Sequence, residues 1–164
     1  MKKRILVLLA SLALIGGSSL FATTGIGAQG GYGVGGDSGA ALTFKVSNVP
    51  CVFAADAFFG NSGMAFGLTA DWWIANPKIV DSFGFFYGVG ASGSVVIGNS
   101  GYTDLRVGGR VVGGLNVFIL KGALEFYAEA AWNPYFEIAL AGDSSYAGPH
   151  IAYFPINAGF RFWF

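Results

Sequence analysis

The chain has 164 residues, of which 54% are hydrophobic and 11% charged, with a formal net charge of zero. Ordinary soluble domains carry roughly 25% charged residues, so this composition favours a membrane protein. Glycine (27 residues) and phenylalanine (16 residues) are abundant, and no run after residue 22 reaches the roughly 20 apolar residues of a spanning helix. There is no basic patch, which argues against nucleic acid as a partner. The composition therefore predicts one all-β membrane domain.

The first residues have the three parts of a secretory signal peptide. Residues 1–4 are basic, residues 5–15 form an apolar core, and residues 16–22 end in small side chains. The apolar run is short for a membrane anchor. We therefore expect residues 1–22 to be a signal peptide and residues 23–164 to form the mature barrel domain. Export leaves the periplasm, the secreted space and the outer membrane as candidate compartments.

The mature chain predicts eight strands, because apolar residues alternate with small or polar ones at the period of two that a strand imposes. Turn signals rich in Gly, Asn, Asp, Ser and Pro separate these segments. Segments of about ten alternating residues behind an export signal are typical of a transmembrane barrel. The predicted strands cover residues 25–36, 40–47, 51–59, 64–73, 83–97, 105–120, 124–132 and 155–164.

The last predicted strand carries an apolar face and ends in bare aromatic residues. An unpaired strand edge of this kind would invite aggregation. We therefore expect residues 155–164 to pair with residues 25–36 and to close an eight-stranded antiparallel up-and-down transmembrane β-barrel. Asn133 and Pro134 predict a bend, beyond which residues 136–140 can continue the seventh strand. Residues 141–153 are expected to form the longest loop.

The charged residues of the predicted strands fall on the face opposite to the apolar one. A basic residue facing lipid at mid-depth costs roughly 2–4 kcal/mol, whereas an interior charge is tolerated beside a partner of opposite sign. Ion pairs are expected between Arg106 or Arg110 and Glu125 or Glu129, because a tight turn joins their strands. We predict a plugged barrel with an interior charge network of Lys45, Asp56, Asp71, Arg106, Arg110, Glu125, Glu129 and Arg161.

Motifs for catalysis, cofactors or metals are weak. Residues 25–30 and 88–93 match GxGxxG, but a dinucleotide site needs a helix after the glycines, and strand alternation continues instead. His150 is the only histidine and Cys51 the only cysteine, which argues against a metal site. We expect no catalytic residue and no cofactor, with His150 in a loop and Cys51 as a small apolar filler.

The signal segment, the eight alternating segments and the terminal sequence 160–164 together resemble the small outer-membrane barrels of the OmpA, OmpX and OmpW type, including small spirochaete-type barrels. The resemblance implies a location in the cell outer membrane, in contact with membrane lipids. It also implies that the barrel-assembly machinery reads Phe160, Phe162 and Phe164 as an assembly signal. External loops in that class are usually long, but of those expected here only residues 141–153 are long, which weakens an adhesin role. The scaffold does not specify a function.

The favoured hypothesis is an integral outer-membrane barrel with a structural or surface role and no enzymatic activity. A small pore or transporter for apolar solutes is the alternative, motivated by Pro134, which could break strand pairing. A lipid-modifying enzyme would depend on His150, but Ala152 stands where small barrel enzymes of that class have a serine. A soluble lipocalin-like barrel would point its apolar face inward, yet the polar face is too sparsely charged for a soluble surface.

Overall fold

The computed structural model describes residues 24–34, 36–60, 63–142 and 148–164. Most of these residues lie in strands, and no helix among them is long and apolar enough to cross a membrane. The expected signal peptide, residues 1–22, lies outside the described residues. The elements are β1 (Thr24–Gly33), β2 (Ser38–Val46), β3 (Cys51–Gly60), β4 (Gly63–Ala75), β5 (Lys78–Val80), β6 (Phe83–Gly98), β7 (Thr103–Ile119), the 3-10 turn η1 (Leu120–Gly122), β8 (Leu124–Trp132), β9 (Tyr135–Ala141), β10 (Gly148–His150) and β11 (Pro155–Trp163).

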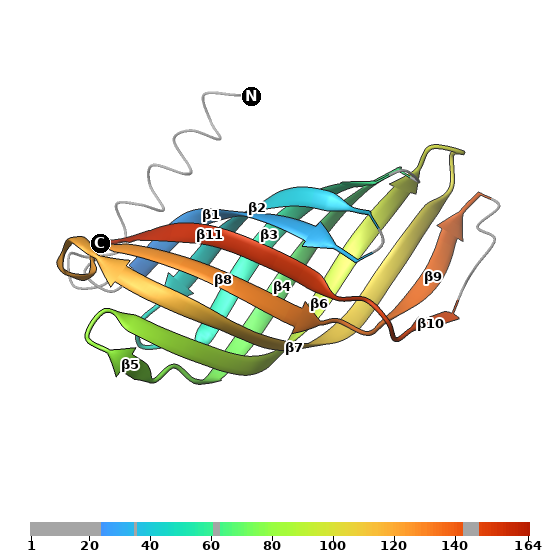
Figure 1. The fold of residues 1–164 in the computed structure, drawn as a ribbon. Helices are drawn as coiled ribbons and strands as arrows, with labels where there is room; N and C mark the ends of the chain where they lie inside the picture. The colour runs from blue at the N-terminus through green and yellow to red at the C-terminus, as the bar shows by residue number, and fades with distance from the viewer. Residues whose placement is uncertain (1–23, 35, 61–62, 143–147) are drawn as a thin grey trace, which may run out of the picture.

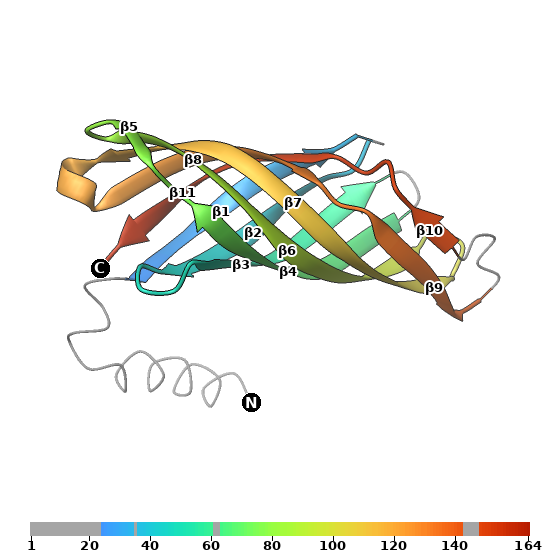
Figure 2. The ribbon, with the colours of Figure 1, turned by 90° about the horizontal axis from the view of Figure 1, so that it is seen from below.

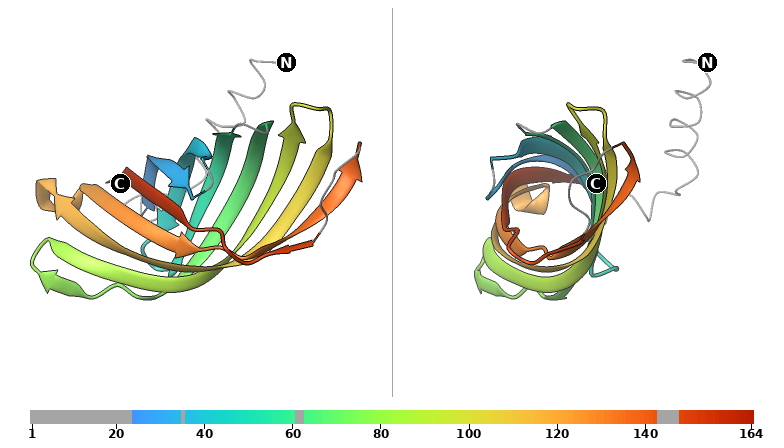
Figure 3. Two further views of the ribbon diagram at one scale, coloured as in Figure 1. Left: turned by 45° about the vertical axis from the view of Figure 1, so that its right-hand side comes forward. Right: turned by 90° about the vertical axis from the view of Figure 1, so that its right-hand side faces the viewer.

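The sheet closes on itself at β1, which pairs with β2 on one side and with β11 on the other. The pairing with β11 is antiparallel and runs from Gly25 opposite Trp163 to Gly33 opposite Pro155. Around the wall the order is β1, β2, β3, β4, β6, β7, β8 and β11, and every neighbouring pair is antiparallel. A view along the axis shows the closed ring (Figure 3, right). The predicted eight-stranded antiparallel barrel, closed by its last strand, is confirmed.

Two of the eight wall strands are each built from two segments. β9 continues β8 beyond Asn133 and Pro134 and pairs with the far part of β7, and β10 pairs with β9 before the chain turns into β11 (Figure 1). Hydrogen bonds persist through the bend, because Pro134 O accepts from Gly109 N at 3.1 Å and Asn133 N donates to Tyr153 O at 2.9 Å. The prediction of one loop over residues 141–153 was wrong in part, since β10 occupies three of its residues.

The strand register fixes the dimensions of the barrel. A path that follows paired residues around the wall from Leu105 on β7 returns to β7 at Leu115, ten residues further along. With this shear and eight strands, the ordinary strand rise and spacing give a tilt of about 40° and a radius of about 8 Å. A barrel this narrow holds side chains in its interior rather than a wide channel.

The two ends of the barrel differ, and the views from the side and from below show this (Figures 1 and 2). Thr24 and Phe164 are hydrogen-bonded to each other at one end, here called the terminal end. The opposite end, where β1 meets β2 and β6 meets β7, is here called the loop end. β6 and β7 are long strands of 16 and 17 residues, whereas β1 and β2 have only 10 and 9. The wall is therefore lower at the β1–β2 side of the loop end.

The strand alternation separates two chemically different faces. The outward face is apolar, as shown by Leu42, Leu68 and Phe162, whose side chains are 70%, 66% and 46% exposed. On the wall strands of the described chain, every Asp, Glu, Lys and Arg lies on the inner face and is buried or half-buried. The exposed charged residues Lys78, Asp81 and Lys121 lie in the terminal-end connections. The barrel is thus polar inside and apolar outside.

Candidate functional site

Arg161 on β11 is the centre of a buried cluster in the terminal-end half of the lumen. It lies directly opposite Glu125 of β8, and its Nη1 donates a hydrogen bond to Glu125 Oε2 at 3.2 Å. Both side chains are 0% exposed. Arg161 Nε also donates to Thr43 Oγ1 at 3.2 Å, and the guanidinium lies 3.9 Å from the ring centroid of Tyr127. The ion pair and the cation–π contact together compensate the lost hydration of the two charges.

Aromatic rings fill the lumen next to this cluster. Trp73 stacks on Phe86 with ring centroids 3.8 Å apart, and both side chains are buried. Lys45 Nζ lies 3.3 Å from the centroid of the Trp73 ring, and Trp163 Nε1 donates to Glu125 at 3.1 Å. These contacts pack the terminal-end half of the barrel with side chains, as the small radius requires.

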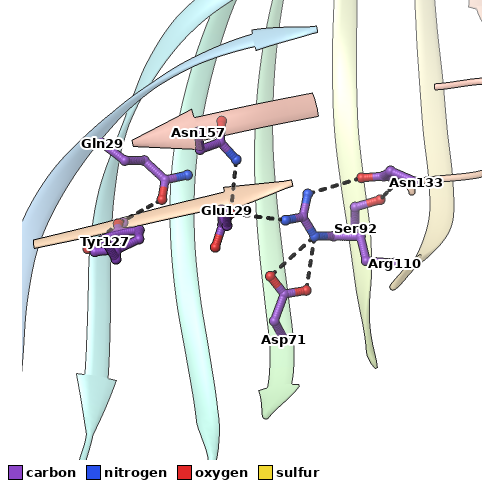
Figure 4. A network of polar contacts seen from close by, with 9 residues as sticks. Gln29, Asp71, Ser92, Arg110, Tyr127, Glu129, Asn133 and Asn157 are labelled. Carbon is purple, nitrogen blue, oxygen red and sulfur yellow. Dashed lines mark hydrogen bonds and ion pairs between the residues drawn. The ribbon is translucent and has the colours of Figure 1, made fainter. Parts of the chain in front are cut away.

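Arg110 on β7 is the centre of a second network at mid-height (Figure 4). Its Nε donates to Asp71 Oδ1 at 2.9 Å, its Nη2 to Glu129 Oε1 at 3.3 Å, and its Nη1 to Asn133 Oδ1 at 3.3 Å. All four side chains are buried. Counted as formal charges, one arginine shared by two carboxylates leaves one negative charge in this network. At the terminal end, Lys45 and Arg161 together with Glu125 leave one positive charge, so the two groups balance.

Neutral side chains extend the network around the inner wall. Asn133 Nδ2 donates to Ser92 Oγ at 2.9 Å, and Asn157 Nδ2 donates to Glu129 Oε1 at 2.9 Å. Beside this network, and not joined to it within the described residues, Tyr127 donates its hydroxyl hydrogen to Gln29 Oε1 at 2.8 Å (Figure 4). The mid-height network therefore joins strands on opposite sides of the barrel, which rigidifies a structure whose outer surface has few polar interactions.

The loop-end half is more open and more acidic. Arg106 on β7 donates to Glu137 Oε2 of β9 at 2.9 Å, and its side chain remains 26% exposed. His150 Nε2 lies 3.5 Å from the same carboxylate oxygen, and its ring stacks on Tyr135 at 4.7 Å. Burial, and next the nearby charge of Asp37, raise the pKa of the Tyr153 phenol to about 12, in the link between β10 and β11. Tyr153 is therefore a neutral side chain at pH 7.

The structure places all eight residues of the predicted charge network on the inner face. Of the ion pairs expected across the sixth and seventh strands, Arg110 pairs with Glu129. Arg106 does not reach Glu125, because β9 continues the wall and puts Glu137 directly opposite Arg106. Glu125 instead pairs with Arg161. Lys45 lies over an aromatic ring, and Asp56 faces a cavity in the loop-end half.

The sequence reasoning missed several interior residues. Glu137 was left out of the charge network although residues 136–140 were expected to be able to continue the seventh strand, and Asp104 was left out because the sixth strand was begun at residue 105. Asp104 is 1% exposed and lies on the same face of β7 as Arg106, two residues away. The alternation that identified Arg106 would have found Asp104 one step earlier. The interior asparagines, Asn116, Asn133 and Asn157, carry no charge and gave no comparable signal.

A polar cavity of about 70 Å³ lies above the mid-height network. Arg110 and Asn157 line it together with Asp37, Asp56 and Tyr153. Two neighbouring hollows at the loop end share Asp37 and Arg106 with this cavity. The loop-end half thus contains open space next to charged groups, whereas the terminal-end half contains packed rings and the ion pair of Arg161.

The fold also shows where the remaining sequence motifs lie. The two GxGxxG segments lie inside β1 and β6, without the helix that a dinucleotide site needs. Within the described residues, no three His, Cys, Asp or Glu side chains are grouped so that they could hold a metal ion. Cys51 begins β3 with its thiol in neither a disulfide nor such a group. Phe160, Phe162 and Phe164, the predicted assembly signal, point outward and are exposed.

Comparisons of this chain with protein-family models, with curated proteins and with solved structures find no match.

Proposed function

We propose that this protein is an integral β-barrel of the cell outer membrane with a structural or surface role and no catalytic activity. The main supporting observation is that the two faces of the wall are reversed relative to a soluble barrel. Charged groups lie inside, and the outward faces of the wall strands present large apolar side chains. In water this exterior would aggregate. In a bilayer it is the surface that membrane lipids solvate, and closure leaves no unpaired edge between strands in the hydrocarbon.

The height of the wall supports the same proposal. A ten-residue strand such as β1 or β3, tilted by about 40°, rises about 25 Å along the axis. The apolar band of outer-membrane barrels is about 25 Å tall. Signal-peptide features in residues 1–22 support export, and Phe160, Phe162 and Phe164 are the proposed signal for the barrel-assembly machinery. In the orientation that we propose, the terminal end faces the periplasm and the loop end faces the outside of the cell.

A pore or transporter for apolar solutes is supported less well. Its motivating feature was loss of pairing at Pro134, yet pairing with β7 resumes on both sides of the bend, at Trp132 and at Tyr135. The lumen at the terminal end is packed with Trp73, Phe86 and Arg161. A role that depends on a closed, rigid wall fits these contacts better than one that depends on passage.

Matched protease sites test the location and the orientation. Ser100→Arg places a trypsin site in the exposed loop-end turn between β6 and β7, and Asn48→Arg places one in the exposed terminal-end turn between β2 and β3. Trypsin added to intact cells should cut the Ser100→Arg protein and spare the Asn48→Arg protein until the outer membrane is permeabilised. Two results would refute the proposal. One is recovery of the mature chain as a soluble periplasmic monomer, and the other is cleavage of both variants only after permeabilisation.

A further inference from the structure

The apolar outer face does not have the same height on all sides of the barrel. β9 continues the outward-facing apolar side chains beside the loop-end half of β7, and Ile97, Ile138 and Leu140 are exposed in this region. The β6–β7 turn and β9 reach further along the barrel than the β1–β2 turn (Figure 1). The wall formed by the loop-end parts of β6, β7 and β9 is here called the tall side. The opposite wall, where β1, β8 and β11 reach the loop end, is called the low side.

The register converts these differences into heights along the barrel axis. Each residue along a strand rises by about 2.5 Å, and each step between paired residues in the direction from β7 through β6 and β1 to β8 descends by about 3 Å. Counted from the level of Leu115 near the terminal end, the tall side reaches about 27 Å at Ile97 and about 33 Å at Leu140. The low side reaches only about 14 Å, at Tyr32.

The terminal end is offset in the same sense as the loop end. Below the tall side, the β2–β3 turn lies at about the level of Leu115, since Cys51 is about 1 Å above that level and Val46 about 2 Å below it. Below the low side, Ile119 and Phe83 lie about 10 Å and about 8 Å beneath the same level. The apolar surface is therefore an oblique belt around the barrel, high on one side and low on the other.

We propose that membrane lipids cover this oblique belt, so that the barrel axis is tilted by about 30° from the membrane normal. The proposal deepens the proposed membrane function and rests on it. In an upright barrel, a hydrocarbon layer of about 25 Å would leave Ile138 in water at the loop end and Ile119 in water at the terminal end. The tilt brings both side chains to the boundaries of the hydrocarbon. Tilting is an ordinary response of a membrane protein whose apolar length exceeds the local bilayer thickness.

Lipid accounts for the whole belt, whereas a docked protein accounts for only part of it. A second copy of the chain on the loop-end part of the tall side would cover Ile97 and Ile138, but it would leave Ile119 exposed at the other end of the barrel. One tilt covers both regions, because the two ends are offset in the same sense. The tall side is then a membrane surface rather than an external arm, and the exposed residues 99–101 of the β6–β7 turn stand at the outer boundary.

The test compares the depths of nitroxide labels at pairs of outward positions that have equal heights on the two sides of the barrel. Single cysteines are labelled in the Cys51→Ala background, and the depth of each label in lipid vesicles is obtained from its accessibility to oxygen and to a nickel chelate. Tyr32 and Leu68 both lie about 14 Å above Leu115. With the tilt, the label of Leu68→Cys lies near the bilayer centre, about 8 Å deeper than that of Tyr32→Cys.

A second pair of positions reverses the order of the two sides. Phe53 and Ala158 both lie about 6 Å above Leu115. Here the low-side label, Ala158→Cys, is expected about 6 Å deeper than the tall-side label, Phe53→Cys. Heat-modifiable gel migration identifies the variants that fold. Trp72→Cys and Ala128→Cys, both at about 3 Å, form a third pair of the same kind and replace a pair in which one variant does not fold.

Depth differences of this size, with the order reversed between the two pairs, support the tilt. Equal depths within each pair would show an upright barrel, which overturns the tilt and leaves the membrane location intact. If every label is open to the nickel chelate, the chain is not inserted, and the proposed function fails together with the tilt. If shielding of an Ile138→Cys label from oxygen rises with the protein-to-lipid ratio, a second copy rather than lipid covers the tall side, and the proposal is likewise overturned.

Discussion

Replacing Arg161 by methionine should be one of the most damaging single changes in the lumen. The substitution keeps an unbranched apolar stem but removes the guanidinium, and it leaves Glu125, 0% exposed, without its ion-pair partner. Breaking a buried pair by removing one member costs about 3–5 kcal/mol. Glu125 retains neutral donors from Asn116 Nδ2 at 2.9 Å and Trp163 Nε1 at 3.1 Å. We therefore expect a loss near the lower bound, about 3 kcal/mol in the free energy of unfolding.

The measurement is reversible urea unfolding in lipid vesicles, followed by tryptophan fluorescence and by gel migration of unheated samples. In the Arg161→Met background, Glu125→Gln should recover part of the loss, because it removes the unpaired charge, with a coupling of about 1–3 kcal/mol. Arg106→Met is the comparison variant, since that side chain is 26% exposed although its partner Glu137 is only 8% exposed, and it should cost clearly less than Arg161→Met. A loss below about 1 kcal/mol for Arg161→Met, or strict additivity with Glu125→Gln, would refute the reasoning.

Three further changes test the two faces and the packed half. Leu68→Arg, at an outward site that is 66% exposed, should cost about 2–4 kcal/mol in vesicles, whereas Leu120→Arg in the terminal-end turn should cost about 0–1 kcal/mol; equal losses would contradict a lipid-facing β4. Trp73→Ala should cost about 3–5 kcal/mol and reduce the near-ultraviolet circular dichroism of the stack with Phe86; an unchanged spectrum would contradict the packed lumen. His150→Ala should leave the lipid composition of the outer membrane unchanged, and an altered lipid profile would revive an enzymatic role.

The division into two faces was predictable from residues alone, whereas the partners of the charges were only partly so. Alternation has a period of two regardless of tertiary structure, so Phe160 and Arg161 had to point in opposite directions. The up-and-down order puts the last strand beside the seventh, which would have placed Arg161 opposite Glu125 had the register been known. Register depends on turn geometry and on where strands end. The sequence indicated that residues 136–140 can continue the seventh strand but not their register against β7, so the pair of Arg106 and Glu137 could not be read from the sequence.

The pair of Arg110 and Asp71 was harder still to predict, because their strands are not neighbours. β6 lies between β7 and β4, and in register Gly90 of β6 separates Arg110 from Asp71. The absence of a side chain at Gly90 lets the two charged groups meet over the middle strand. The same arrangement recurs where Gly159 of β11 separates Gln29 from Tyr127, which are hydrogen-bonded. Inner-face glycines thus determine which polar side chains can meet, as well as creating space.

Gly90→Ala tests this role directly, with Gly93→Ala on the same strand as its match. A Cβ at Gly90 would collide with Asp71 Oδ1 and with Ala70 O, while a Cβ at Gly93 would have its nearest contact at 3.9 Å. We expect Gly90→Ala to cost about 1–3 kcal/mol from overpacking, and Gly93→Ala to stay within about 0.5 kcal/mol of the parent protein. In an Asp71→Ala background the cost of Gly90→Ala should fall, since the carboxylate it displaces is gone. If the cost is unchanged there, the backbone clash alone accounts for Gly90, and the glycine has no part in bringing Arg110 and Asp71 together.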